Sequence, residues 1–273
     1  MNRTLRLLAL CVIALVPATS LMAQQGTLER IKKSGEFRIG YRTDARPLSF
    51  EQNGQAAGYS VDICRRVASA VRDHLKLSDM KVTYVPVTSE NRFDAVAKGD
   101  ADIGFVAYAP ERVGTVEFSQ VYMLVQQTFI VPDDSRIKSV NDIDQPGLRI
   151  SAGKGDSIAL YLARNLKQAK LVETDSTPAD TQRKFAAGEI DAFGANRQRL
   201  TTMLGDMKGY RLLPDGLFGV PQTIVVAKGK AAALAAVNAF IDEVRESGFL
   251  RDSIAKSGVV GLEVAPKGHK LER

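Results

Sequence analysis

The chain has 273 residues, of which 45% are hydrophobic and 25% are charged, a composition that supports one or two hydrophobic cores without disulfide bonds. The formal net charge of +6 is a mild excess without the concentrated basic stripe of a nucleic-acid-binding protein, so we expect no nucleic-acid partner. The whole chain holds two histidines and two cysteines, which are few ligands for metal or triad chemistry, and we expect no metal and no cofactor.

The first 23 residues have the pattern of a secretory signal peptide. Arg3 and Arg6 precede an apolar run at residues 7–16, and residues 21–23 end in the small side chain typical of a cleavage site. The apolar run is too short for a membrane-spanning helix. Removing this segment leaves 35 Lys and Arg against 31 Asp and Glu, and one cysteine, Cys64, on an apolar helical stripe. We therefore expect export to the periplasm and no internal disulfide.

Strand and helix patterns alternate along the rest of the chain. Period-2 and buried apolar runs predict strands at residues 36–41, 81–86, 101–106, 123–131, 148–151, 170–174, 190–193, 210–213 and 222–227. Helical spacing predicts helices at residues 26–34, 61–75, 91–98, 157–166, 178–187, 200–207, 231–246 and 249–256. This alternation predicts an α/β fold with mostly parallel sheets flanked by helices.

Two such runs, joined by two extended crossings, predict two lobes around a cleft. The chain is expected to leave the first lobe near Leu124 and to return near Pro221. Lobe 1 then comprises residues 24–124 and 221–273, and lobe 2 comprises residues 125–220. The two crossing strands are the expected hinges.

The segment at residues 98–122 is the centre of the predicted site. A short buried strand leads through Pro110 to Arg112. An arginine in this position can hold an anion with its planar pair of donors. The alternative is a surface arginine paired with Glu111 or Glu117.

Other candidates lie where loops leave the carboxyl ends of strands, which is where open α/β sheets meet their ligands. Arg42 and Asp44 follow the first strand, and a solvent-exposed ion pair between them is the alternative. Ser89 and Arg92 stand at the start of a helix, where Ser89 is a good cap. Positive charge at that end opposes the helix dipole, which favours a ligand role for Arg92.

A glycine-rich turn at residues 152–157 enters a further helix. Exposed backbone amides at a helix start bind anions, and Lys154 adds a positive charge beside Gly155 and Asp156. No GxxxxGK[ST] sequence is present, so this is not a nucleotide-binding P-loop. Asn196 lies in the turn that follows a later predicted strand, at residues 190–193.

The order of strand, turn, Pro-Glu-Arg and Phe-Ser-x-x-Tyr at residues 98–122 resembles the bacterial extracellular solute-binding proteins, family 3, which serve polar amino-acid ABC transporters. The Gly-aromatic-x-x-Asp segment at residues 58–62 matches the same family. The resemblance covers nearly the whole mature chain. It implies a type II periplasmic binding fold with two lobes and two hinge crossings. It also implies a monomer that captures a small anionic or zwitterionic ligand, an amino acid or related organic acid, and delivers it to the membrane permease of an ABC importer.

The resemblance implies roles for individual residues. Arg112 corresponds to the arginine that holds the ligand carboxylate, together with the amides of the turn at residues 153–155. Arg42, Ser89 and Arg92 resemble residues that line the pocket of acidic-ligand relatives.

Three departures from the family pattern bear on the ligand. The interval from Gly99 to Arg112 is about two residues shorter than usual. Ala107 stands where relatives carry a hydroxyl, so Tyr108 is the alternative hydroxyl or stacking face. Asn196 stands where relatives usually have the aspartate that pairs with the α-ammonium, and an amide does not neutralise a buried cation. These departures predict that the ligand is a carboxylate without an α-ammonium, or an acidic amino acid whose ammonium is held by Asp44 or Asp156.

Two other functions fit the same architecture. A periplasmic enzyme resembling the cyclohexadienyl dehydratases would need a positioned acid in the cleft, with Asp44, Asp156 and Glu173 as candidates. A ligand sensor presented to a membrane receptor would carry the same binding site. We expect a binding protein and not an enzyme.

Overall fold

The computed structural model describes residues 26–88, 90–175 and 177–271, so the expected signal peptide and Ser89 lie outside the described residues. Its helices are α2 (Thr27–Ser34), α3 (Tyr59–Leu75), α4 (Arg92–Ala97), α5 (Ser157–Asn165), α6 (Pro178–Ala186), α7 (Arg197–Asp206), α8 (Ala231–Glu246) and α9 (Phe249–Ser257), with 3-10 turns η1 (Pro110–Arg112) and η2 (Val140–Asp142). Its strands are β1 (Glu36–Arg42), β2 (Asp44–Ala45), β3 (Ser49–Gln52), β4 (Gln55–Ala57), β5 (Lys81–Val87), β6 (Ile103–Ala107), β7 (Val116–Phe118), β8 (Met123–Pro132), β9 (Arg149–Gly153), β10 (Lys170–Thr174), β11 (Ala192–Asn196), β12 (Tyr210–Leu212), β13 (Phe218–Ala227) and β14 (Leu262–Val264).

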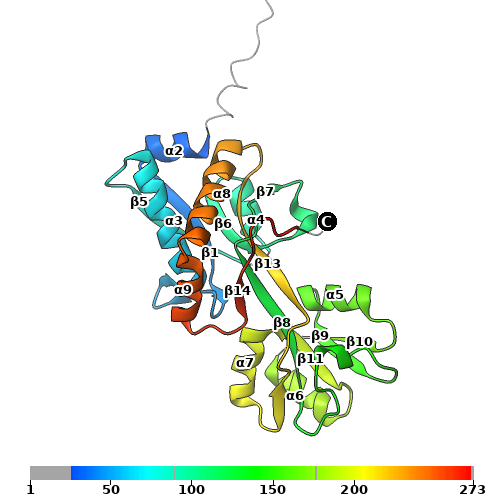
Figure 1. Cartoon of the computed structure of the whole chain (residues 1–273). Helices are drawn as coiled ribbons and strands as arrows, with labels where there is room; N and C mark the ends of the chain where they lie inside the picture. Colours follow the sequence, from blue (N-terminus) through cyan, green and yellow to red (C-terminus); the bar gives the residue numbers. More distant parts are fainter. Residues whose placement is uncertain (1–25, 89, 176, 272–273) are drawn as a thin grey trace, which may run out of the picture.

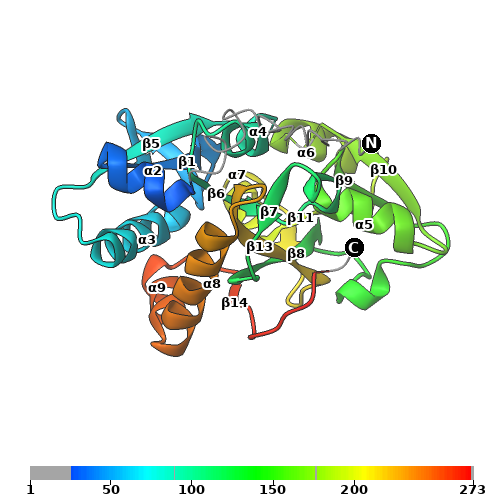
Figure 2. The ribbon, with the colours of Figure 1, turned by 90° about the horizontal axis from the view of Figure 1, so that it is seen from above.

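Two long antiparallel strands, β8 and β13, connect the halves of the molecule (Figure 1). On one side of this pair β6, β1 and β5 form parallel pairs, and on the other side β11, β9 and β10 do the same. Seen from above, the lobe 1 elements lie at one side and α5, β9 and β10 at the other, with β8 and β13 between them (Figure 2). The predicted two-lobe α/β fold is confirmed. Leu124 pairs with Pro221 in the register of β8 and β13, and the exact lobe boundaries stay a prediction.

Each lobe has helices on both faces of its sheet. In lobe 1, α3 and α8 pack on one face of β1, and α4 covers the other face with Phe93 and Val96. In lobe 2, neighbouring residues of β8 point to opposite faces, so Phe129 packs with α5 and Ile130 packs with α7. Cys64 is 1% exposed in the lobe 1 core, as predicted, and burial raises the pKa of its thiol. Among the described helices, none has the length and apolarity of a membrane span.

Two helix and strand boundaries differ from the predicted ones. Helix α7 begins at Arg197 and not at residue 200, because the Asn196 side chain caps it by accepting a hydrogen bond from the Arg199 amide at 2.9 Å. Strand β13 begins at Phe218 and runs through Pro221, although a proline lacks an amide donor. The carbonyl of Pro221 accepts from the Tyr108 amide at 2.9 Å, which keeps this part of the strand paired.

Several short strands, including β7, have no counterpart in the predicted elements. The loop after β1 contains β2 and β3, which form a separate three-stranded sheet with β4. Asn53 and Gly54, with φ of 52° and 73°, make the tight turn between β3 and β4. Strand β14 pairs with β8 beside the crossing. These strands are two to four residues long, too short for a hydrophobic period to appear in the sequence.

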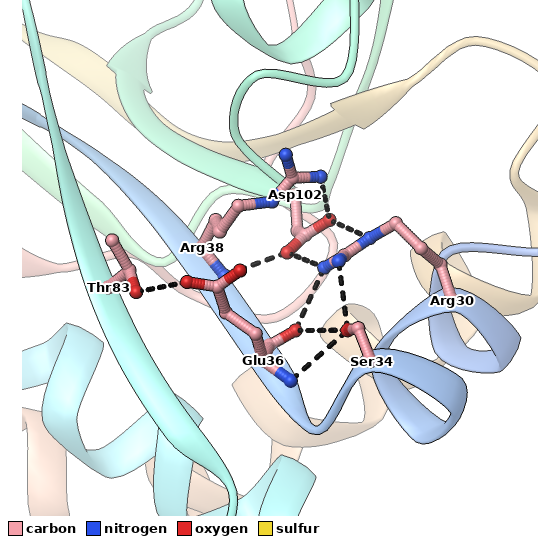
Figure 3. Close-up of polar contacts among 6 residues, drawn as sticks. All are labelled: Arg30, Ser34, Glu36, Arg38, Thr83 and Asp102. Carbon is pink, nitrogen blue, oxygen red and sulfur yellow. Dashed lines mark hydrogen bonds and ion pairs between the residues drawn. The ribbon is translucent and has the colours of Figure 1, made fainter.

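A cluster of charged side chains ties α2 to the lobe 1 sheet (Figure 3). Asp102, whose side chain is 3% exposed, accepts hydrogen bonds from the guanidinium groups of Arg30 and Arg38. It also accepts one from the Arg38 backbone amide at 2.7 Å. Asp102 thereby joins α2, β1 and the turn before β6 at a point away from the cleft between the lobes.

Gly58 determines how the loop after β1 lies on the start of α3. Its φ is +109°, and a Cβ there would lie 2.6 Å from the carbonyl oxygen of Leu48. The amide of Ser60 donates to that same oxygen at 2.7 Å. We expect Gly58→Ala to lower the free energy of unfolding by about 2 kcal/mol, because both the backbone strain and the clash must be relieved. Urea unfolding measures this loss.

Gly99→Ala is the matched control for this variant. Gly99 has φ of +80°, but a Cβ there would meet no atom within 4 Å. It should lose only about 1 kcal/mol, the cost of the left-handed backbone alone. Equal losses in the two variants would contradict the close packing of Gly58 against Leu48.

Candidate ligand-binding cleft

A cavity of about 240 Å³, the cleft cavity, lies between the lobes. Its polar lining from lobe 1 is Arg42, Ser49, Ser60 and Arg92. Its polar lining from lobe 2 is Gln127, Asp156, Ser157, Asn196 and Arg199, and Gln222 lines it from the lobe 1 end of β13. Apolar side chains such as Leu48 and Phe105 complete the wall, so charged groups face a partly apolar space.

The sheet topology explains why these residues meet. Arg42 ends β1, and Arg92 begins α4 immediately after β5, the parallel neighbour of β1. In lobe 2, Asp156 follows β9 and Asn196 ends β11, again two parallel neighbours. Carboxyl ends of parallel strands meet at one edge of a sheet, and the two edges face each other across the cleft.

A second, more open cavity of about 630 Å³, the outer cavity, adjoins the first. Both cavities are lined by Arg42, Asp156, Asn196 and Arg199. Arg46 adds a further positive charge to the outer cavity, and its guanidinium carbon lies 3.8 Å from the centre of the Phe50 ring.

Of the residues singled out in the sequence, five line the cleft cavity. They are Arg42, Arg92, Ala107, Asp156 and Asn196. The side chain of Asp44 and the whole of Ser89 are outside the part of the chain that the structure describes. The backbone of Asp44 lies in β2, next to the Arg42 end of β1.

Arg112 does not line either cavity, in contrast to the expectation from the sequence. Its guanidinium lies 3.8 Å from the Asp94 carboxylate and 5.4 Å from the centre of the Phe93 ring. Turn η1 begins three residues after the end of β6, and the chain turns back onto α4 before Arg112 can reach the cleft.

Three other candidates also lie outside the cleft and outer cavities. The Tyr108 ring packs edge-on against Phe118, with 5.0 Å between the ring centres. Lys154 and Gly155 are exposed, and the Lys154 amide donates to the carbonyl of Thr174 at 3.1 Å. The glycine turn therefore uses an amide within the fold, and the start of α5 at Ser157 lines the cavity in its place.

Arg199 is the most important residue that the sequence reasoning missed. Its guanidinium lies 3.5 Å from the Asp156 carboxylate, and both side chains are partly exposed to the cleft. The predicted helix began at residue 200, which left Arg199 in a turn of unspecified direction. The cap residue Asn196, three positions earlier, is the signal that would have placed Arg199 in the first turn.

Gln198 was missed as well. It is 3% exposed and lines the outer cavity, and neither its side-chain nitrogen nor its oxygen has a hydrogen-bond partner among the described residues. A buried amide without partners is costly to the fold. Within the described residues, no group of three or more His, Cys, Asp or Glu side chains is arranged to hold a metal ion.

Known proteins resemble this chain in both sequence and structure. Residues 37–257 match the model of the bacterial extracellular solute-binding proteins, family 3. The chain is 26% identical over 230 residues to an ABC transporter glutamine-binding protein of Bacillus subtilis, covering 83% of this chain and 82% of the relative. It is also 29% identical over 169 residues to a cyclohexadienyl dehydratase of Pseudomonas aeruginosa, covering 60% of each chain.

The crystal structure of an ancestral amino acid-binding protein, described as a precursor of cyclohexadienyl dehydratase, superposes with a TM-score of 0.64 at 25% identity. The match covers 85% of this chain and 98% of that one. The family match spans both lobes and both crossing strands, including every described residue that we place at the cleft. The chain belongs to the bacterial extracellular solute-binding proteins, family 3.

Proposed function

We propose that this protein is the binding component of an ABC importer, which captures a small carboxylate-bearing ligand between its two lobes. The observation that carries the proposal is the cleft cavity, into which lobe 1 presents Arg42 and Arg92 and lobe 2 presents Arg199. Guanidinium groups are the side chains best suited to pairing with carboxylates. The glutamine-binding relative, named as part of an ABC transporter, supports the transport role.

Ligand binding is coupled to closure of the lobes in this proposal. A ligand that contacts both lobes stabilises the closed state, because only that state makes both sets of contacts. Strands β8 and β13 are the connections that must bend, and their pairing at Leu124 and Pro221 marks the expected hinge. A membrane permease then recognises the closed form. Export by a signal peptide to the periplasm and action as a monomer complete the proposal, and the extracellular description of the family supports it.

We assign the carboxylate-binding role to Arg92. The resemblance to the family gives this role to Arg112, but Arg92 lines the cleft cavity and Arg112 is turned towards Asp94. Arg92 is half-buried at the first position of α4, with its guanidinium carbon 4.8 Å from the centre of the Phe93 ring. The apolar ring beside the charge reduces its exposure to water, which strengthens its attraction for an anion.

A dehydratase activity is the second candidate, because one relative is a cyclohexadienyl dehydratase. Such a reaction needs an acid positioned over the substrate. Asp156 is the acid among the described residues that line the cleft cavity, and it is paired with Arg199. Glu173 is exposed on β10 and does not line the cavity. We therefore favour binding without catalysis.

A thermal-shift screen of the mature protein, after unfolding and refolding to remove bound ligand, tests the proposal. The set contains amino acids, dicarboxylates, keto acids and aromatic acids. A ligand at 100 times its dissociation constant adds about 2.7 kcal/mol to the free energy of unfolding, which raises the melting temperature measurably. Stabilisation by a carboxylic acid, recovered unchanged after incubation, supports binding. No stabilisation by any acid contradicts the proposal, and dehydration of a cyclohexadienyl acid contradicts the absence of catalysis.

A further inference from the structure

The charges that line the cleft exceed what a zwitterionic ligand would balance. Among the described residues lining the cleft cavity, Arg42, Arg92 and Arg199 stand against the single carboxylate of Asp156, an excess of two positive charges, and Arg46 adds one more at the outer cavity. An acidic amino acid carries a net charge of −1, whereas a dicarboxylate without an ammonium group carries −2. Charge balance in a partly apolar cleft favours the dicarboxylate.

The Asn196 side chain is oriented to donate hydrogen bonds. Its Oδ1 accepts from the Arg199 backbone amide at 2.9 Å, and because an amide N–H only donates, the capping atom must be the oxygen. The Nδ2 group is therefore the second polar atom of this side chain, which lines the cavity. No hydrogen bond from it to another described residue is present. An N–H donor can bind a carboxylate oxygen, but it has nothing to offer an ammonium, which is itself only a donor.

The other polar groups of the wall do not replace the missing acid. Asp156 is paired with Arg199 at 3.5 Å, so its charge is already partly balanced. The side-chain nitrogens of Gln127 and Gln222 donate to the carbonyls of Val125 and Val220, at 3.1 and 3.3 Å. Their oxygens are neutral acceptors. They can accept from a hydroxyl but do not neutralise a cation.

We propose that the ligand is a small dicarboxylate without an α-ammonium group, either unsubstituted or carrying a hydroxyl. This inference rests on the proposed function and names the class of ligand for the same cleft. Arg92 and Arg42 hold the ligand from lobe 1. Arg199 and the Nδ2 donor of Asn196 hold it from lobe 2, and the apolar wall at Leu48 and Phe105 contacts the carbon chain.

Isothermal titration of the ligand-stripped mature protein with succinate, malate and aspartate tests the inference. These acids share one four-carbon skeleton and differ by hydrogen, hydroxyl or ammonium at one carbon, and glutarate and glutamate repeat the comparison with five carbons. We expect succinate or malate to bind at least tenfold more tightly than aspartate. Tighter binding of aspartate or glutamate would overturn the inference and leave the proposed function intact. Failure of every acid and amino acid to bind would overturn both.

Asn196→Asp provides the matched test within the protein. Aspartate caps helices as well as asparagine does, so the fold and α7 are retained, while the new carboxylate adds an acceptor and a negative charge to the cleft. We expect this variant to bind the dicarboxylate at least tenfold more weakly and to shift the ratio of affinities towards the amino acid. Asn141→Asp, an exposed site on η2, makes the same charge change away from the cleft and should leave the ratio unchanged. An unchanged ratio in Asn196→Asp would also overturn the inference.

Discussion

Replacing Arg92 by alanine is expected to weaken ligand binding about a hundredfold, whereas replacing Arg112 by alanine should change the affinity less than threefold. Removing one partner of a desolvated, hydrogen-bonded charge pair costs about 2–5 kcal/mol, and 1.4 kcal/mol is a factor of ten in affinity. Arg92 lines the cleft cavity, so its loss leaves a ligand carboxylate without its donor. The Arg112 side chain is 38% exposed and lies beside Asp94, 3.8 Å away. An exposed pair of this kind contributes little.

Isothermal titration with the tightest-binding acid from the screen measures both affinities. The two arginines flank the same Phe93 ring, so Arg112→Ala controls for any disturbance of α4. Melting temperatures without ligand should be similar in the two variants, which separates loss of binding from loss of folding. A larger loss of affinity in Arg112→Ala than in Arg92→Ala would contradict our assignment and would support the family role of Arg112.

Asp102→Ala is expected to lower the free energy of unfolding by about 3 kcal/mol, without a direct effect on the ligand site. The carboxylate is 3% exposed and serves two guanidinium groups and one backbone amide (Figure 3). Removing one member of a buried ionic network costs about 3–5 kcal/mol, because the remaining charges stay buried without their partner. We expect a value at the lower end, since Arg30 and Arg38 retain side-chain exposures of 31% and 24% and can be partly hydrated.

Chemical unfolding with urea, followed by circular dichroism, gives this free energy. Asp100→Ala is the matched control, because Asp100 lies two residues away in the same turn but is exposed. It should change the free energy of unfolding by less than about 0.5 kcal/mol. If the two variants lost stability equally, Asp102 would not be the centre of the network that joins α2 to β1.

The secondary structure was largely predictable because its signals are local. Helix α8 has its predicted bounds, Ala231–Glu246, since its apolar stripe repeats with helical spacing over four turns. The long apolar run of β8 was equally clear. The elements that the sequence did not predict are too short to show a repeating pattern. Strands β2 and β14 are examples, because two or three residues contain no repeat.

The position of a charged side chain was less predictable than the element that carries it. Arg112 was identified by its place after a buried strand. Its position beside Asp94 depends on where α4 packs. Arg199 shows the reverse case. Its place in the cleft follows from the cap at Asn196, which starts α7 three residues earlier than the apolar pattern indicated.

The sequence by itself determined the family, the two-lobe α/β fold, and the strand ends at which Arg42, Arg92, Asp156 and Asn196 meet. The family follows from the resemblance carried by residues 58–62 and 98–122, and the other features follow from periodicity, turn residues and topology rules, which act over short stretches of chain. Only the tertiary structure decided which cations face the cleft. This outcome depends on contacts between residues distant in the chain, and a shift of about half a helical turn is enough to reverse the direction of a side chain.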